Sequence, residues 1–112
     1  MLLLLPISAA KGMDKNGDFT IIGTGTFTCN FWTQSRRQET AADVLLQKNN
    51  DGWITGFISA YNVFVHDEAN VAEGLEMPQL YSWLDVYCMD NPTKGIAYAT
   101  GEMLLYLKTR KR

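Results

Sequence analysis

The chain has 112 residues, of which 46% are hydrophobic and 20% are charged, and its formal net charge is −2. These values are typical of one globular domain that buries a modest core. A net charge this small does not steer a protein toward nucleic acid or toward a strongly acidic partner, so we expect neither.

An apolar segment, MLLLLPISAA, occupies residues 1–10. Its leucine run and small residues are typical of the end of a signal peptide, although the charged residues that normally precede such a run are missing. We interpret it either as a signal-peptide remnant or as an apolar N-terminal arm that docks on a partner or a hydrophobic groove. The run is too short to span a bilayer, so no transmembrane segment is expected. Residues 11–112 are predicted to form a single helical domain, with its core in about 23–109.

The first elements of that domain are predicted from local residue types. Residues 18–29, DFTIIGTGTFTC, alternate threonine with phenylalanine and isoleucine, which predicts extended chain or a small hairpin. A short helix is expected to begin near Cys29, with Thr28 as a candidate N-cap. The apolar residues of TAADVLLQK, residues 40–48, predict a short helix or a half-buried turn.

The stretch QKNNDGWITGF, residues 47–57, looks at first like half of a calcium loop. With Gly52 at the turn position, Asn49 and Asp51 fall where an EF-hand places two oxygen ligands. The first and last ligand positions hold Gln47 and Ile58 in place of acids, so only one charged ligand would remain. We therefore expect no metal site here and predict a turn between two regular elements.

Apolar residues at steps of three and four predict three further helices. They cover residues 53–65, residues 79–92 with an end at Asn91-Pro92, and residues 95–109. Gly56 costs the first of them about 1 kcal/mol relative to alanine, which we expect close packing by another helix to offset. The three apolar faces consist of Trp53, Phe57, Ala60, Tyr61 and Phe64; of Leu80, Trp83, Leu84, Tyr87 and Cys88; and of Ile96, Ala99, Met103, Leu104 and Leu107.

The two cysteines, Cys29 and Cys88, lie far apart in the sequence, and neither belongs to a CxxC pair. One disulfide fits this spacing and the signal-like start, and both features favour an oxidising compartment. Closing a loop of about sixty residues stabilises a fold by roughly 4 kcal/mol in the chain-entropy model. Two unrelated buried thiols are the alternative. The fold predicted from these features is mainly α: a small single-domain bundle of four to five helices with one disulfide and an extended or hairpin N-terminal segment.

Residues with catalytic potential are few. His66, the only histidine, opens the sequence HDE, but no second histidine completes a common zinc set and no nucleophile motif accompanies it. An enzyme would need His66 close to a pair of carboxylates in a cleft, and a solvated helix end is the preferred interpretation. Asp85 lies on a mostly apolar helix, where Arg36, Arg37 or a backbone cap would pair with it in a structural role. We expect no enzymatic activity, no catalytic or metal-ligating residue and no cofactor.

Aromatic residues make up 12% of the chain. Those that the core leaves exposed are expected to bind a protein partner, because aromatic side chains give a large contact area at low entropic cost. The candidates for this partner surface are Trp32, Trp53, Tyr61, Tyr81 and Tyr106.

Three stretches carry a resemblance to a known family: GTGTFTCNFW, GWITGFISAYN and WLDVYCMDNPTKGIAYATGEML. Over about residues 23–109 they resemble small secreted bacterial proteins of the HdeA/HdeB-like type. That pattern has a cysteine with aromatics at the start of the first helix, a Gly–aromatic helix, a second cysteine followed by Asn-Pro, and an alanine-containing last helix. In this chain the matching residues are Cys29, Phe31, Trp32, Gly56, Phe57, Cys88, Asn91, Pro92, Ala97 and Ala99.

The resemblance implies a periplasmic or secreted, all-α domain with one disulfide. The best-known members are acid-stress chaperones, which are homodimers at neutral pH and dissociate in acid to expose apolar surface to unfolded clients. We therefore expect a non-enzymatic periplasmic protein that acts through protein–protein contact, with an acid-stress chaperone as the named variant. The alternatives are an immunity or inhibitor protein, similar to the Tai-type immunity proteins of type VI secretion, or an accessory subunit of an envelope complex.

Overall fold

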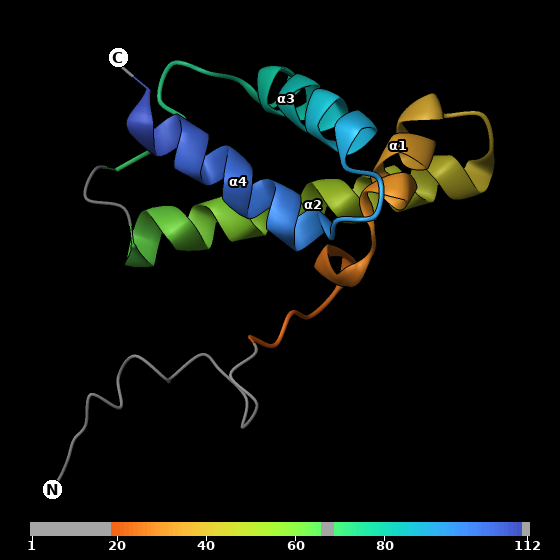
Figure 1. The fold of residues 1–112 in the computed structure, drawn as a ribbon, viewed down its shortest axis with the longest axis horizontal. Helices are drawn as coiled ribbons and strands as arrows, with labels where there is room; N and C mark the ends of the chain where they lie inside the picture. The colour runs from red at the N-terminus through yellow and green to blue at the C-terminus, as the bar shows by residue number, and fades with distance from the viewer. Residues whose placement is uncertain (1–18, 66–68, 111–112) are drawn as a thin grey trace, which may run out of the picture.

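The computed structural model describes residues 19–65 and 69–110, and it shows a helical domain (Figure 1). The prediction of a mainly α domain of four to five helices with one disulfide is confirmed. No helix within these two ranges is long and apolar enough to cross a membrane. The regular elements are η2 (a 3₁₀ turn, Thr24–Thr26), α1 (Cys29–Arg37), α2 (Ala41–Phe64), α3 (Met77–Asp90) and α4 (Ile96–Thr109).

Helices α3 and α4 run antiparallel to each other, and α1 lies near the loop that joins them (Figure 1). α1 contacts each of the other three helices, and α3 packs on α4. The apolar spacing predicted for α4 is confirmed, since all five of its predicted residues are buried. Each large side chain buried in this way stabilises the fold by about 1.5–3 kcal/mol. The buried hydrophobic residues are Cys29, Trp32, Ile54, Ile58, Val71, Ala72, Leu80, Leu84, Cys88, Ile96, Ala99, Met103, Leu104 and Leu107.

The first turn of α1 is anchored on the loop between α3 and α4. The backbone N–H of Cys29 donates to the carbonyl of Lys94 at 2.7 Å, and that of Asn30 donates to the carbonyl of Pro92 at 3.1 Å. Because the first N–H groups of a helix have no partner within it, these bonds satisfy two of them. Thr28 is the N-cap residue, as predicted, but its side chain makes no capping bond. Loop carbonyls therefore take the place of a side-chain cap.

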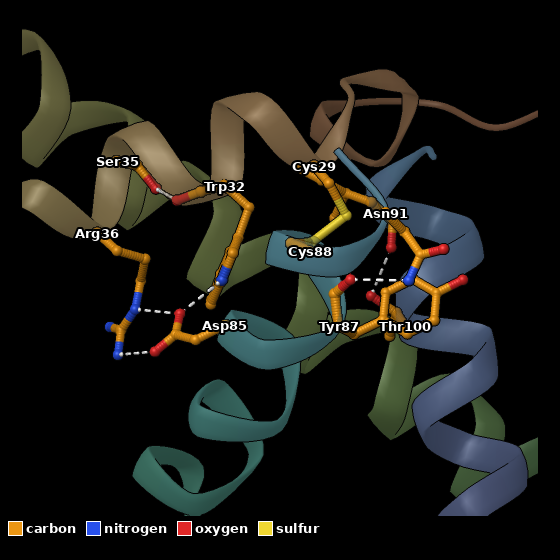
Figure 2. Close-up of a disulfide and its surroundings, with 10 residues drawn as sticks. Cys29, Trp32, Ser35, Arg36, Asp85, Tyr87, Cys88, Asn91 and Thr100 are labelled. Carbon is orange, nitrogen blue, oxygen red and sulfur yellow. Dashed lines mark hydrogen bonds and ion pairs between the residues drawn. A yellow bond between two sulfur atoms is a disulfide. The ribbon is translucent and has the colours of Figure 1, made fainter. Parts of the chain in front are cut away.

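A disulfide joins Cys29 to Cys88, with 4.9 Å between their Cα atoms, and both residues are buried (Figure 2). The predicted pairing is thus confirmed, in place of two unrelated thiols. The bond ties the first residue of α1 to the last turn of α3 across a sequence separation of 59 residues. It lies beside the backbone bonds that hold the start of α1, so that end of the helix is fixed twice.

Asp85 provides a second tie between α1 and α3 (Figure 2). Its carboxylate accepts hydrogen bonds from Arg36 Nε at 2.9 Å and Arg36 Nη2 at 3.1 Å, and from the indole N–H of Trp32 at 2.8 Å. The guanidinium carbon of Arg36 lies 5.4 Å from the ring centroids of both Trp32 and Tyr81. A partly exposed ion pair alone contributes about 0–1 kcal/mol, so the fixed geometry comes from the combination of bonds. The structural role expected for Asp85, with Arg36 as partner, is confirmed.

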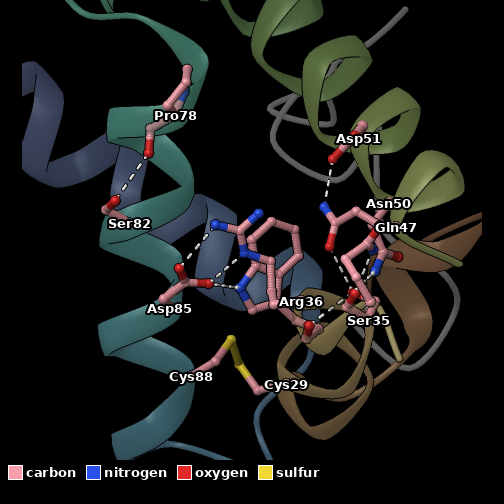
Figure 3. A network of polar contacts seen from close by, with 12 residues as sticks. Cys29, Ser35, Arg36, Gln47, Asn50, Asp51, Pro78, Ser82, Asp85 and Cys88 are labelled. Carbon is pink, nitrogen blue, oxygen red and sulfur yellow. Dashed lines mark hydrogen bonds and ion pairs between the residues drawn. A yellow bond between two sulfur atoms is a disulfide. The ribbon is translucent and has the colours of Figure 1, made fainter. Parts of the chain in front are cut away.

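Helix α2 is continuous over 24 residues, and the turn predicted within residues 47–57 is wrong. Asn50 is fully buried, and its Nδ2 donates to the Ser35 hydroxyl at 3.3 Å (Figure 3). That hydroxyl donates to Gln47 Oε1 at 2.8 Å, and Gln47 Nε2 donates to Asp51 at 2.6 Å. These amides bond to Ser35 of α1 and to the Asp51 carboxylate rather than to their own backbone, so they do not break the helix. Residues 47–58 therefore do not form the loop that an EF-hand requires.

Gly56 and Gly52 both lie on the exposed side of α2. A methyl group added at either glycine would have no neighbouring atom within 4 Å beyond the local helix. The expectation that another helix packs closely on Gly56 is therefore wrong. The helix tolerates these glycines because its buried side and its capped start supply enough stability.

The segment before α1 packs over Trp53 of α2. The indole N–H of Trp53 donates to the carbonyl of Ile22 at 2.6 Å. Gly23 has a left-handed φ of 90°, and a Cβ there would lie 2.9 Å from Trp53 Cδ1. A Cβ on Gly25 would overlap the indole ring itself. Residues Thr24–Thr26 form a 3₁₀ turn where extended chain or a hairpin was predicted, because glycine lets the backbone turn closely over the ring. The apolar segment of residues 1–10 lies outside the described residues.

Thr40 and Asp43 form a reciprocal capping box at the start of α2. The Asp43 carboxylate accepts backbone N–H groups from Glu39 at 3.0 Å and Thr40 at 3.2 Å, and the amide of Gln34 at 3.4 Å. Burial by itself would raise the pKa of Asp43, but these hydrogen bonds outweigh it and hold the pKa below its ordinary value of 3.8. The ionised form is therefore the one that stabilises the start of α2.

We expect the stabilising effect of Asp43 to disappear in acid. Its pKa is lower in the folded chain than in the unfolded chain, so its contribution is present above about pH 4 and is lost as pH falls through the folded pKa. Urea unfolding of wild type and Asp43→Asn, measured from about pH 6 to pH 2, should show a difference in stability that shrinks toward low pH. A difference that stays constant over this range would contradict the assignment.

Candidate functional site

The predicted aromatic surface is divided among different parts of the fold. Trp32 does not belong to any surface, because it is only 1% exposed and its indole bonds to Asp85. Trp53 lies under residues 22–25, and Tyr81 packs against Trp32 and Arg36. Tyr61 and Tyr106 lie on separate helices, and Tyr106 is 53% exposed. Trp32 is therefore excluded from the predicted partner surface. The other four residues do not form one continuous surface, and their binding to a partner stays a prediction.

Tyr81 is better described as part of the α1–α2–α3 junction. Burial raises the pKa of its hydroxyl, and a hydrogen bond to the Asp51 carboxylate adds to the increase. Its ring makes an edge-on contact with Trp32, with 5.3 Å between the centroids. The hydroxyl thus links α3 to the polar network on α2, and Tyr81 stays neutral at physiological pH.

Two of the surface hollows lie at helix ends, and the first of these is at the C-terminal end of α2. This α2 groove has a volume of about 260 Å³. Two of its lining residues are largely exposed, Phe64 at 83% and Val65 at 62%, and Val63, next to them in the sequence, is 72% exposed. Exposed apolar residues that are contiguous in this way mark binding surfaces more often than scattered ones do. The groove is lined by Phe57, Ala60, Tyr61, Phe64 and Val65.

Helix α2, which carries the α2 groove, is longer than its neighbours, and its C-terminal end lies apart from α4 (Figure 1). A helix of 24 residues spans about 36 Å, whereas the 14 residues of α3 or α4 span about 21 Å. Sequence reasoning placed Phe57, Tyr61 and Phe64 on one apolar face and treated that face as core. No sequence signal indicated that part of this face would remain uncovered, because the helices predicted over residues 53–65, 79–92 and 95–109 are of similar length.

The second hollow, the α3 pocket, lies at the C-terminal end of α3 and has a volume of about 350 Å³. Trp83 and Tyr87 stack with 5.3 Å between centroids and 10° between planes, and Tyr106 of α4 lies 6.1 Å from Trp83. Asn91 closes the end of the helix by donating to the carbonyl of Tyr87 at 2.9 Å (Figure 2). The lining residues are Trp83, Val86, Tyr87, Asp90 and Asn91. Trp83 and Tyr87 were predicted as core, but both are only partly buried.

Within residues 19–65 and 69–110, no three His, Cys, Asp or Glu side chains cluster closely enough to hold a metal ion. His66, considered above as a catalytic candidate, lies outside these ranges. Asn62 accepts the backbone N–H of Val71 at 2.9 Å, which gives it a structural role. The chain matches no family model, no curated protein and no solved structure.

Proposed function

We propose that the chain is a non-enzymatic protein of an oxidising, extracytoplasmic compartment such as the periplasm, and that it acts by binding another protein through the α2 groove. The single observation that carries the proposal is the run of exposed apolar residues at the end of α2, with Phe64 83% exposed beside a groove. Apolar surface of this kind gains free energy when a partner covers it.

The compartment is supported by the disulfide. A buried bond between Cys29 and Cys88 persists in oxidising surroundings and is rare in proteins of the cytosol. The polar groups of the junction support the non-enzymatic part of the proposal. Asp85 and Arg36 join α3 to α1, and Asp51 bonds to Gln47 on its own helix and to the Tyr81 hydroxyl of α3. These polar groups serve the packing of the helices.

The acid-stress chaperone implied by the HdeA/HdeB-like resemblance is the variant that one observation favours. Asp43 caps the same helix that carries the α2 groove, and the cap depends on the ionised carboxylate. Protonation below about pH 4 would loosen the start of α2 and expose more apolar surface. An immunity protein or accessory subunit would use the same groove for one fixed partner.

The test compares two substitutions on α2, Phe64→Ser and Leu45→Ser. Both remove an exposed apolar side chain, since Leu45 is 62% exposed, but Leu45 lies at the opposite end of the helix. Photo-crosslinking from position 60 in periplasmic extract at neutral pH, with mass spectrometry of the adducts, identifies what the groove contacts. We expect Phe64→Ser to reduce crosslinking about tenfold and Leu45→Ser to leave it unchanged.

The pattern of adducts separates the variants of the proposal. One stoichiometric partner at neutral pH supports an immunity protein or accessory subunit. Many clients, captured only below about pH 4 together with rising binding of an apolar dye, support the chaperone. Equal loss of crosslinking in both variants, or no adduct at either pH, would overturn the groove as a binding surface.

A further inference from the structure

We propose that the α3 pocket binds the guanidinium group of an arginine presented by a partner polypeptide, with the rings of Trp83 and Tyr87 and the carboxylate of Asp90 as the recognising groups. This inference depends on the proposed function in one respect, which is that the arginine belongs to a protein partner. The α3 pocket is a different site from the apolar α2 groove and recognises a charged group. It is therefore tested separately.

The geometry of the lining residues suits a planar cation. Trp83, Tyr87 and Asp90 follow one another at spacings of four and three residues, so they project from one side of α3. The two rings are nearly parallel, and an aromatic face attracts a cation placed within about 6 Å of its centroid. Asp90 is exposed and makes no ion pair with any described residue. A guanidinium in the pocket would therefore meet both a ring and a carboxylate acceptor.

The same helix already holds a guanidinium in this way on its other side. Arg36 lies over the rings of Trp32 and Tyr81, and its nitrogens bond to Asp85. Tyr81 and Asp85 are four residues apart on α3, and Tyr87 and Asp90 are three residues apart. The α3 pocket offers the same three residue types, with its two rings stacked where Trp32 of α1 and Tyr81 meet edge to face, and none of the residues that line it is cationic.

The surrounding charge favours a cation as well. The pocket lies at the C-terminal end of α3, where the helix dipole is negative, and the last turn of α3 contains no basic residue. Burial raises the pKa of the Tyr87 hydroxyl, and Tyr98 and the negative charge of Glu102 add to the increase. The ammonium of Lys94 lies 4.8 Å from the centroid of Tyr98, and Lys94 is not a lining residue.

The test titrates the full ¹⁵N-labelled chain with N-acetyl-arginine amide and, separately, with N-acetyl-citrulline amide. Citrulline has nearly the same shape but no charge, so it isolates the contribution of the cation. We expect arginine alone to shift the indole N–H signal of Trp83 and the amide signals of Tyr87 and Asp90, with a dissociation constant on the order of 1 mM. Asp90→Asn should weaken binding about three- to fivefold, and Trp83→Leu about three- to tenfold.

Glu39→Gln is the matched control, because it also removes one exposed negative charge. Glu39 follows the C-terminal end of α1, whereas the disulfide to the last turn of α3 is at the other end of that helix. It should bind arginine as wild type does. Equal shifts with citrulline, or unchanged affinity in Asp90→Asn, would overturn the proposal. Thermal unfolding of each variant shows whether it has folded. If Trp83→Leu does not fold, the affinity of Asp90→Asn for arginine still decides the test. Loss of arginine binding with normal crosslinking at the α2 groove removes this site and leaves the proposed function standing.

Discussion

We expect the double substitution Cys29→Ala and Cys88→Ala to lower the free energy of unfolding by about 4 kcal/mol. The bond closes a loop across a sequence separation of 59 residues, and without it the unfolded chain gains the entropy of that open loop. Both positions are buried, so alanine avoids the unpaired hydroxyl that serine would introduce. Urea unfolding under oxidising conditions measures the loss as a lower transition midpoint.

The control for this prediction is a reductant. Dithiothreitol should lower the midpoint of the wild type toward that of the double variant and should leave the double variant unchanged. A wild type whose midpoint does not respond to complete reduction, verified by thiol titration, would show that the bond contributes little to stability.

We expect Gly25→Ala to destabilise the fold by about 1–3 kcal/mol. The new methyl group would overlap the indole ring of Trp53, which is held in place by its hydrogen bond to the Ile22 carbonyl. Either the ring or the 3₁₀ turn must shift, and the hydrogen bond is weakened in both cases. The measurement is the midpoint of thermal unfolding, with Trp53 fluorescence as a local report of the displacement.

Gly56→Ala provides the comparison for Gly25→Ala, because it is the same chemical change on the exposed side of α2. No atom beyond the local helix lies within 4 Å of the added methyl group, so alanine should stabilise the helix by about 1 kcal/mol. Opposite signs for the two substitutions would locate the effect in the contact with Trp53. Destabilisation by both would mean that α2 is not the uninterrupted helix described above.

The helices with regular apolar spacing were predictable from the sequence, and α2 was only partly so. Ile96, Met103 and Leu107 recur at helical intervals, so they lie on one side of α4, and all three are buried. In α2, Asn50 and Gly52 are typical of turns, and the contact that overrides this preference comes from Ser35 on another helix. A contact between residues 15 positions apart leaves no periodic trace in the sequence.

The surface hollows were harder to predict than the fold. Trp32 and Trp83 are both aromatic residues on amphipathic helices, yet one is buried and the other lines a pocket. The difference depends on which helix lies opposite each ring and how far that helix extends. Asp85 was predictable as a structural residue because a carboxylate on an apolar face needs a nearby donor, and Arg36 was among the few available.

The two ties between α1 and α3 fail under different circumstances. Reductants cleave the Cys29–Cys88 bond but leave the contacts of Asp85 in place, whereas high salt screens the ion pair between Asp85 and Arg36 and leaves the disulfide intact. Reducing surroundings and high salt therefore each weaken a different tie. The junction between α1 and α3 keeps its other tie under either change.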